Sequence, residues 1–409
     1  MIRRLATALT ATFLASCTTT PGGDQTGASQ GEAATDSQPA DGATASAAQL
    51  FPLLDAEAGP AENLFYSPLS IDYAFGIVAL GARGETARQL ASILPPPRSA
   101  GEYTSNADGV ELRLASRLWV NSEFSVAPDF TQAARRRYDA GAEEIDIGAP
   151  DTSARRMNAW ADENTDGLIQ QIVNPGEITP DIALFVTNAI LFDGDWARTF
   201  GGSAEKPFLF GDGTEQPFRL MQERLTLRTV DRGEWRAVRL PYAGGRYAMD
   251  VIMPDRREVM TAAPDLETIA EIDDALAGTD AQLVDMELPR FEIETDLALI
   301  EPLQALGLTL PFDRSHADLS GIGSGWEQNL YVSGAKQLAR LQVFETGTRA
   351  AAVTVVGVSL TSAPPPDLRS AIPFTVDRPF LAIIRDLEND TMLFLGRIAA
   401  PKAYQPQDP

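Results

Sequence analysis

The sequence contains very little of the chemistry on which many enzymes depend, since its 409 residues include one Cys and one His. Cys17 and His316 alone cannot form a disulfide framework, a structural zinc site or a Cys–His catalytic relay. Basic residues are also scarce, with 33 Lys and Arg against 57 Asp and Glu and a net charge of −24. Nucleic acid is disfavoured as a partner, because a phosphate backbone recruits basic surface. We expect no metal and no cofactor, which leaves carboxylate or Ser/Lys enzymes and binding or inhibitory proteins.

Long apolar runs are also missing, and the first apolar stretch is interpreted as a targeting signal and not as a membrane span. Arg3 and Arg4 precede the apolar residues 5–14, which are too few to cross a bilayer as a helix and are typical of a secretory signal. Residues 14–17, Leu-Ala-Ser-Cys, resemble a bacterial lipobox, in which the chain is cut before a Cys that then receives diacylglycerol. The alternative is an ordinary signal peptide that contains a Cys.

The lipobox implies a signal peptide at 1–16 and lipidation at Cys17. We therefore expect a protein secreted across the inner membrane and held by lipid at the cell envelope, in the periplasm or at the cell surface. Residues 17–46 are small and polar with no large apolar side chain, so this lipidated segment should be a flexible tether. Residues 47–403 contain no second linker of this kind and are predicted to form one domain, followed by a disordered tail at 404–409.

The pattern of elements in the folded part predicts an α+β domain. Ser67 and Pro68 open an almost wholly apolar helix that Gly81 ends, and residues 152–173 have helical spacing. Residues 112–120 alternate as a strand, and the apolar run 182–192 suggests a strand buried on both faces. Helices come mostly early and strands mostly late, which favours α+β over alternating α/β.

One segment, residues 343–361, stands out as a strand with unusual flanks. From Thr348 onward one face is small and then aliphatic, and the other carries the only charge, Arg349. Gly347 before it permits a sharp change of backbone direction. The three prolines at 364–366 prevent the strand from continuing, because they lack the N–H groups that a ladder needs. Taken alone, such a run is an ordinary core strand.

The neighbourhood of this segment resembles the serpin family, from about Leu64 to Lys402. Several stretches follow the family order: residues 63–71 (Asn-Leu-Phe-Tyr-Ser-Pro-Leu-Ser-Ile), 188–192 with 194–196 (Asn-Ala-Ile-Leu-Phe and Gly-Asp-Trp), 288–291 (Leu-Pro-Arg-Phe), 345–352 (Glu-Thr-Gly-Thr-Arg-Ala-Ala-Ala), 376–381 (Val-Asp-Arg-Pro-Phe-Leu) and 394–398 (Phe-Leu-Gly-Arg-Ile). The resemblance implies a large mixed sheet A, smaller sheets B and C, about eight to nine helices and an exposed reactive loop at about 345–372.

The same resemblance implies an inhibitor that acts as a suicide substrate for serine-type endopeptidases and not as an enzyme. A protease cuts the loop, remains attached to it, and is carried away as the loop inserts into the central sheet. The stretch from Thr348 should lie in solvent in the intact protein. The residues implied for the hinge and for insertion are Glu345, Gly347, Thr348, Ala350, Ala351 and Ala352. The charge of Arg349 falls on the outer face of the strand and should not block insertion. Relatives usually carry an acidic residue there and in place of Thr346, so insertion is expected to be slower here.

A second group of residues resembles the region where the family's sheet opens. It comprises Ser67, Ser70, Asn188, Trp196 and Gln337. We expect a buried polar cluster in which Gln337 replaces the family's usual histidine, and we interpret Trp196 as a packing residue that controls strand separation.

The hinge spacing places the reactive bond at Thr361–Ser362, which suits elastase-like or subtilisin-like proteases with small apolar pockets. The chain is several residues longer than usual on the far side of this bond. Arg369–Ser370 is therefore a rival bond, which would imply a trypsin-like target. It would also require the three prolines to enter a sheet.

Two other functions are compatible with parts of the sequence. Ser333 and Lys336 fit the Ser-x-x-Lys pair of penicillin-recognising hydrolases, but the further signatures of that class are absent. A non-inhibitory serpin, a binding or storage module that never inserts its loop, is the nearer alternative. Its hinge would usually carry bulky or charged residues, whereas this hinge is mostly small. We expect the protein to be a monomer.

Overall fold

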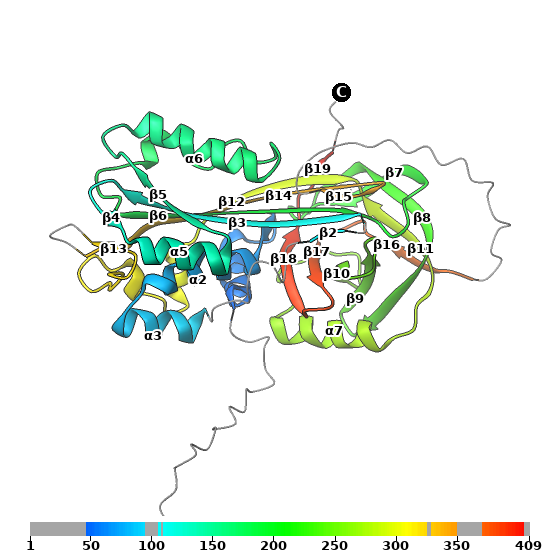
Figure 1. The fold of residues 1–409 in the computed structure, drawn as a ribbon. Coiled ribbons are helices and arrows are strands. Elements are labelled where there is room, and N and C mark those ends of the chain that lie inside the picture. The colour runs from blue at the N-terminus through cyan, green and yellow to red at the C-terminus, as the bar shows by residue number, and fades with distance from the viewer. Residues whose placement is uncertain (1–45, 95–104, 108, 325–328, 350–369, 405–409) are drawn as a thin grey trace, which may run out of the picture. The chain divides into compact units, whose positions relative to one another are not determined.

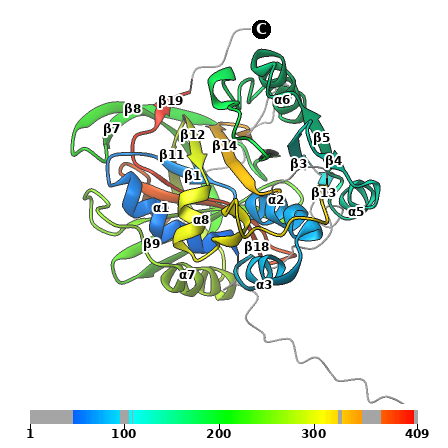
Figure 2. The same ribbon diagram turned by 90° about the vertical axis from the view of Figure 1, so that its left-hand side faces the viewer.

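The computed structural model describes residues 46–94, 105–107, 109–324, 329–349 and 370–404. This part of the chain contains seven α-helices and two large sheets, which confirms the predicted α+β class (Figure 1). In Figure 1 the strands of the first sheet run across the view and those of the second sheet lie towards its right-hand side. Helix α6 lies at the top and α7 at the bottom in both views (Figure 2).

The first sheet is mixed and has the strand order β19-β12-β14-β15-β6-β3-β2, with β5 paired to β3. Two contacts are parallel, β14 with β6 and β3 with β5, and the others are antiparallel. The strands are β2 (Ser105–Ala107), β3 (Val110–Asn121), β5 (Gly141–Ile145), β6 (Leu184–Asp195), β12 (Phe291–Ala298), β14 (Val332–Phe344), β15 (Gly347–Arg349) and β19 (Lys402–Ala403).

The second sheet has nine strands in the order β1-β18-β17-β10-β9-β8-β11-β16, with β7 also paired to β8. The two smaller sheets that we expected are joined here, because the long strand β8 pairs with β7 and β11 along one part and with β9 along another. The strands are β1 (Leu64–Tyr66), β7 (Gly202–Leu209), β8 (Glu215–Arg232), β9 (Trp235–Pro241), β10 (Tyr247–Pro254), β11 (Gln282–Pro289), β16 (Ile372–Thr375), β17 (Phe380–Asp386) and β18 (Thr391–Ile398). A separate short pair joins β4 (Ser125–Val126) to β13 (Gly323–Ser324).

The helices cover the sheets and confirm the buried helix predicted after Ser67. They are α1 (Phe51–Ala58), α2 (Pro68–Gly81), α3 (Gly84–Ile93), α5 (Pro128–Tyr138), α6 (Pro150–Asn164), α7 (Leu266–Gly278) and α8 (Ile300–Ala305), with 3-10 turns η1 (Ala47–Leu50), η2 (Pro175–Glu177) and η3 (Leu310–Phe312). In α2, the Ser67 hydroxyl accepts the Ser70 amide and caps the helix, as the sequence predicts. Within the described ranges, no helix is both long and apolar enough to cross a membrane.

The helix predicted over 152–173 is shorter than expected, since α6 ends at Asn164. Asp166 and Gly167 adopt the left-handed region with φ values of 47° and 80°, which a continuing α-helix cannot contain. The turn leaves α6 short enough to lie on the outer face of the first sheet, where Trp160 packs edge-on against Trp119 of β3 at 6.0 Å between ring centroids.

The start of the folded domain is attached to α2 by a buried carboxyl group. The Ala47 amide donates to Asp72 at 2.8 Å, and the Tyr66 hydroxyl donates to the carbonyl oxygens of Ala47 and Ala48. Asp72 is buried, and this burial raises its pKa to about 8, although the hydrogen bond from Ala47 opposes the rise. The folded protein therefore retains a proton at Asp72 that the unfolded chain releases near pH 4.

This proton predicts a pH-dependent effect of Asp72→Asn. Below about pH 4 both states of the wild type are protonated, and its stability falls as the pH rises towards 8. Asn retains the acceptor for the Ala47 amide and does not titrate. We expect the variant to melt about 2–6 °C above the wild type at pH 8, with the difference disappearing near pH 4. Calorimetry at pH 5, 6.5 and 8 measures this. A difference that does not change with pH would contradict it.

Candidate functional site

The hinge residues lie inside the first sheet. Gly347, Thr348 and Arg349 form β15, which is inserted between β14 and β6 and is antiparallel to both. Our expectation that the stretch from Thr348 lies in solvent is therefore wrong for its first two residues, because both Thr348 and Arg349 are buried. Backbone groups in a strand are best satisfied by pairing on both edges, which explains why the chain joins the sheet where a partner edge is open.

Gly347 is required for close approach and not for the change of direction that we predicted. A Cβ atom at this position would lie 2.3 Å from the carbonyl oxygen of Gly194 in β6, which is far inside the contact distance. Its φ lies outside the left-handed region. Glycine at 347 thus lets the backbones of β15 and β6 come together, whereas a Cβ atom at Gly194 would meet the rings of Phe192 and Tyr242.

Trp196, directly after β6, holds the chain that leads into β15. Its backbone N–H donates to the Thr346 carbonyl at 2.9 Å and its indole N–H donates to the Phe344 carbonyl at 3.0 Å. The indole stacks on Tyr242 with 4.6 Å between ring centroids, and the Tyr242 hydroxyl donates to the Thr348 hydroxyl at 2.8 Å. Burial raises the pKa of Tyr242, so its hydroxyl remains protonated and able to donate. This placement agrees with the packing role that we expected for Trp196.

Glu345 precedes β15 and contacts two residues that flank strands of the second sheet, Phe200 before β7 and Arg290 after β11. Its carbonyl accepts the Phe200 amide at 2.9 Å, and its carboxylate pairs with Arg290 at 3.2 Å. The hinge is thus fixed by backbone and side-chain contacts on both sides of Gly347.

Further along from β15, towards the start of β6, strands β14 and β6 pair directly with each other. Residues 332–337 of β14 pair in parallel with 184–188 of β6. Between these pairs and β15, residues 189–192 of β6 have no strand partner on this edge in the described part of the chain. Among the described residues, the edge between β6 and β14 is thus paired at one end, without a partner at 189–192, and occupied by the hinge at the other end.

Gln337 bridges the buried polar cluster at the paired end of this edge, as predicted. Its side-chain oxygen accepts the Ser67 amide at 2.9 Å, and its NH2 group donates to the Ser67 carbonyl and the Ser70 hydroxyl at 3.1 and 2.9 Å. All three residues are buried. The cluster ties β14 to the first turn of α2.

Asn188 does not join this cluster, although it lies opposite Gln337 in the pairing of β6 with β14. Its NH2 group donates to the Ser116 hydroxyl of β3 at 2.6 Å. Its side-chain oxygen is buried and has no hydrogen-bond partner among the described residues. The expected cluster of four residues is thus divided across the boundary between β14 and β6, which we call the seam: Ser67, Ser70 and Gln337 lie on one side and Asn188 on the other.

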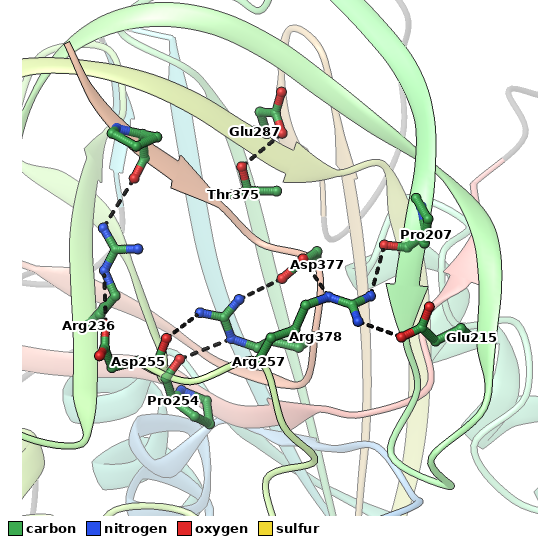
Figure 3. Close-up of polar contacts among 11 residues, drawn as sticks. Pro207, Glu215, Arg236, Pro254, Asp255, Arg257, Glu287, Thr375, Asp377 and Arg378 are labelled. Atoms are coloured by element: carbon green, nitrogen blue, oxygen red, sulfur yellow. Dashed lines mark hydrogen bonds and ion pairs between the residues drawn. The ribbon is translucent and has the colours of Figure 1, made fainter. Parts of the chain in front are cut away.

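The chain that follows the loop is held in the second sheet by a hub at Glu287 of β11 (Figure 3). Its carboxylate accepts hydrogen bonds of 2.6–2.9 Å from three strands. The donors are the ammonium group of Lys206 in β7, the amide of Gln222 in β8 and the hydroxyl of Thr375 in β16. Although burial opposes ionisation, these hydrogen bonds hold the pKa of Glu287 below its usual value. One side chain therefore connects four strands.

Asp377, just after β16, is held by two arginines (Figure 3). Arg257 donates to it at 2.8 Å and also contacts Glu215 at the start of β8, and Arg378 donates to it at 2.6 Å. Arg378 continues to the carbonyl of Pro254 at 3.0 Å. Sequence analysis missed Glu287 and Arg257, and only the stretch 376–381 gave a signal for this region.

The Ser-x-x-Lys pair is not assembled for chemistry. The Ser333 hydroxyl accepts the Ala183 amide and donates to the Leu184 carbonyl, while the Lys336 ammonium pairs with Glu177 and Asp296. Each of the two side chains is thus held by partners of its own. The hydrolase alternative therefore has no support.

Several expected site residues lie outside the described residues. They are Cys17, Ala350, Ala351, Ala352, Thr361 and Ser362, together with the rival bond Arg369–Ser370, of which Ser370 alone is described.

Comparison with known proteins gives one consistent result. The family model described as serpin (serine protease inhibitor) matches residues 41–401. The leukocyte elastase inhibitor of Xenopus tropicalis is 29% identical over 83% of this chain and 93% of its own, and Iris of Ixodes ricinus is 31% identical over 83% and 92%. The native-state structure of the thermophilic serpin tengpin superposes with a TM-score of 0.73, at 25% identity over 83% of this chain and 89% of that one. The chain belongs to the serpin family.

Proposed function

We propose that this protein inhibits serine-type endopeptidases of elastase-like or subtilisin-like specificity by cleavage and insertion of its reactive loop. The nucleophilic serine of the protease attacks the carbonyl of Thr361, the bond to Ser362 breaks, and the protease remains as an ester on Thr361. The freed end then follows β15 into the sheet. The protease supplies all the chemistry, and this chain supplies the bait and the movement.

The observation that carries this proposal is the position of β15. It pairs Thr348 with Gly194 of β6 and with Val343 of β14, in a direction that leads towards residues 189–192 of β6. Continued at the same register, each further residue would advance one position, and Val358 would face Leu184, where β6 begins. A strand of this length fills the sheet from one end to the other. The chain from Thr348 to Thr361, where the protease is attached, would span roughly 45 Å when extended, at about 3.3 Å per residue.

Insertion must open the paired end of the seam. The parallel pairs of β14 with β6 would be exchanged for two antiparallel ladders, which use more hydrogen bonds and are the more stable arrangement per residue. On the inner face, Gln337 must stay with Ser67 and Ser70 while Asn188 moves away with β6, a division that the hydrogen bonds already show.

The register also favours Thr361–Ser362 over Arg369–Ser370 as the reactive bond. With Val358 at the end of β6, Thr361 lies only three residues beyond the sheet. At this register the prolines at 364–366 lie beyond the sheet, so the expected objection that cleavage after Arg369 forces them into it does not apply. Cleavage there would instead lengthen the unpaired segment after Val358 from three residues to eleven, which adds no ladder hydrogen bonds. The relative in Xenopus tropicalis is named as an elastase inhibitor, which supports a target that accepts a small residue such as Thr361.

The two faces of the inserted strand predict opposite effects for two neighbouring substitutions. At the register of β15, position 350 falls between Phe192 and Leu341, which are both fully buried, and position 351 falls beside Arg340 on the outer face. Ala350→Glu would place a charge in the core, at a cost of several kcal/mol. It should turn the inhibitor into a substrate that is cut without forming an SDS-stable complex with pancreatic elastase or subtilisin. Ala351→Glu is the matched control: position 351 also lies opposite the buried Leu191, but Arg340 on its other side offers the carboxylate a partner, so this variant should retain the complex.

Equal complex formation by the two variants would contradict insertion at this register. A wild-type protein that is cut by both enzymes and forms no complex with either would favour the non-inhibitory alternative.

The products of cleavage give a second test. We expect the C-terminal fragment released by SDS from cut protein to begin at Ser362, and the cut protein to melt above the intact one, because a whole strand is added to the sheet and its backbone groups gain ladder hydrogen bonds. N-terminal sequencing and calorimetry measure these results. A fragment that begins at Ser370, or a melting temperature that does not rise, would overturn the assignment of the bond or of insertion.

We also propose that the protein is anchored to a bacterial cell envelope by lipid on Cys17. The lipobox at residues 14–17 and the small, polar stretch that follows support this. In a bacterial host fed labelled palmitate, the wild type should carry label and partition into detergent, whereas Cys17→Ser should do neither. Label on the serine variant would contradict the assignment.

A further inference from the structure

A row of charged and polar side chains crosses the outer face of the first sheet at the level of Arg349. Residues directly opposite each other in neighbouring strands point to the same face. The pairings of β3, β6, β15, β14, β12 and β19 place six residues in one row, in the order Glu111, Asp193, Arg349, Gln342, Glu292 and Lys402. Arg349 is the one basic residue between the two glutamates.

The acidic side of this row continues beyond it. Asp195 of β6 and Asp166, in the turn after α6, both contribute negative potential at Asp193. Arg113 of β3 does not neutralise the group alone, because it is shared between Glu111 and Asp166. On the other side of β15, Glu292 receives hydrogen bonds from Arg340 and Gln342. The position between Asp193 and Gln342 is therefore one that a cation occupies favourably and an anion does not.

Arg349 is held there by charge more than by hydrogen bonds. Its side chain is 6% exposed, and its Nε lies 3.6 Å from an Asp193 oxygen, beyond hydrogen-bond length. Two of its guanidinium nitrogens, Nε and Nη2, have no hydrogen-bond partner among the described residues. A buried cation with so few hydrogen bonds depends strongly on its counter-charge. Burial raises the pKa of Asp193 to about 6 although Arg349 opposes the rise, so Asp193 is ionised at neutral pH.

The period of a strand converts this contact into a constraint on register. If the chain slipped by one residue, Arg349 would point inward to the position of Thr348, which is fully buried and bonded to Tyr242. The core cannot accept a guanidinium group there without a partner. Only registers that keep Arg349 on the outer face allow it to reach Asp193.

We propose that Asp193 is a positioning residue, which fixes the register in which the loop joins the sheet by pairing with Arg349. The consequence for inhibition rests on the proposed function. The position of the hinge itself does not, because it is a property of the uncut protein. From the sequence, Arg349 was expected to lie on the outer face without blocking insertion, and its replacement of the usual acidic residue was expected to slow it. In the proposed role, Arg349 is instead the cation that pairs with the acidic residues of the row.

Hydrogen exchange of the intact protein at pH 7.5 tests the proposal without a protease. Asp193→Asn removes the counter-charge and retains the shape of the side chain. We expect exchange in a peptide covering residues 343–349 to become about tenfold faster or more, while amides of α2 exchange as in the wild type. Glu294→Gln is the matched control. It also removes one negative charge from the outer face of the sheet, but it lies outside the row, 3.9 Å from Arg340, and should leave exchange at 343–349 unchanged.

A charge exchange separates pairing from a merely structural role. Arg349→Asp and Asp193→Arg should each speed exchange at the hinge, and the double variant should restore it to within about threefold of the wild type. Restoration requires the pair to interact, since two independent defects would add. Unchanged exchange in Asp193→Asn, or a double variant as fast as the faster single one, would overturn the proposal.

The result is distinguishable from a failure of the proposed function. If the wild type never forms a covalent complex, the inhibitory function fails and the exchange experiment still decides the role of Asp193. If complexes form and Asp193→Asn does not change hinge exchange, the positioning role fails alone. If both hold, Asp193→Asn should also consume more inhibitor per protease inhibited, because the loop then joins the sheet in mixed registers.

Discussion

One edge of β6 is shared between two neighbours, and the architecture of the loop depends on this division. The lower part of the edge pairs in parallel with β14, and the upper part pairs antiparallel with β15. Residues 189–192 lie between the two and have no strand partner on that edge in the described part of the chain. Because buried backbone groups are stabilised by pairing, this stretch favours any strand that can reach it. The segment that follows β15 can do so, because β15 already pairs with the adjoining part of the same edge.

The two ends of the loop are held by different kinds of interaction. At the upstream end, β15 is held by strand pairing and by the backbone contacts of Trp196, so extending the strand continues the same interaction. At the downstream end, the hub at Glu287 and the pairs of Asp377 with its two arginines are side-chain interactions specific to one position. Pairing can propagate along a sheet, whereas a set of ion pairs cannot move with the chain. This asymmetry keeps the downstream end in place while the upstream end is ready to advance.

The sequence predicted those parts of the site that depend on local pattern, and it failed where the outcome depends on which strands become neighbours. The capped α2 and the alternation at Arg349 follow from periodicity, and the bridging role of Gln337 follows from its place in the family pattern. The burial of Thr348 could not be predicted, since a single strand does not reveal whether its neighbours have separated to admit it. Asn188 was assigned to the wrong side of the seam, because Ser116 is equally able to accept its hydrogen bond and is remote in sequence.

The arginine at position 349 of the hinge and the acidic residues on the outer face of the first sheet are best understood together. An arginine after Thr348 would be unfavourable in a sheet with a neutral or basic outer face, because a strand of period two must bury it beside its neighbours. In this chain the neighbours in the row are acidic, with Glu111 and Asp193 on one side and Glu292 on the other. Some of the acidic residues behind the overall charge of −24 therefore lie where they need a cation nearby, and Arg349 supplies it. Since a slip of one residue would turn Arg349 into the core, the same contact fixes the face of each residue that follows, and hence how far the chain can insert before the sheet ends.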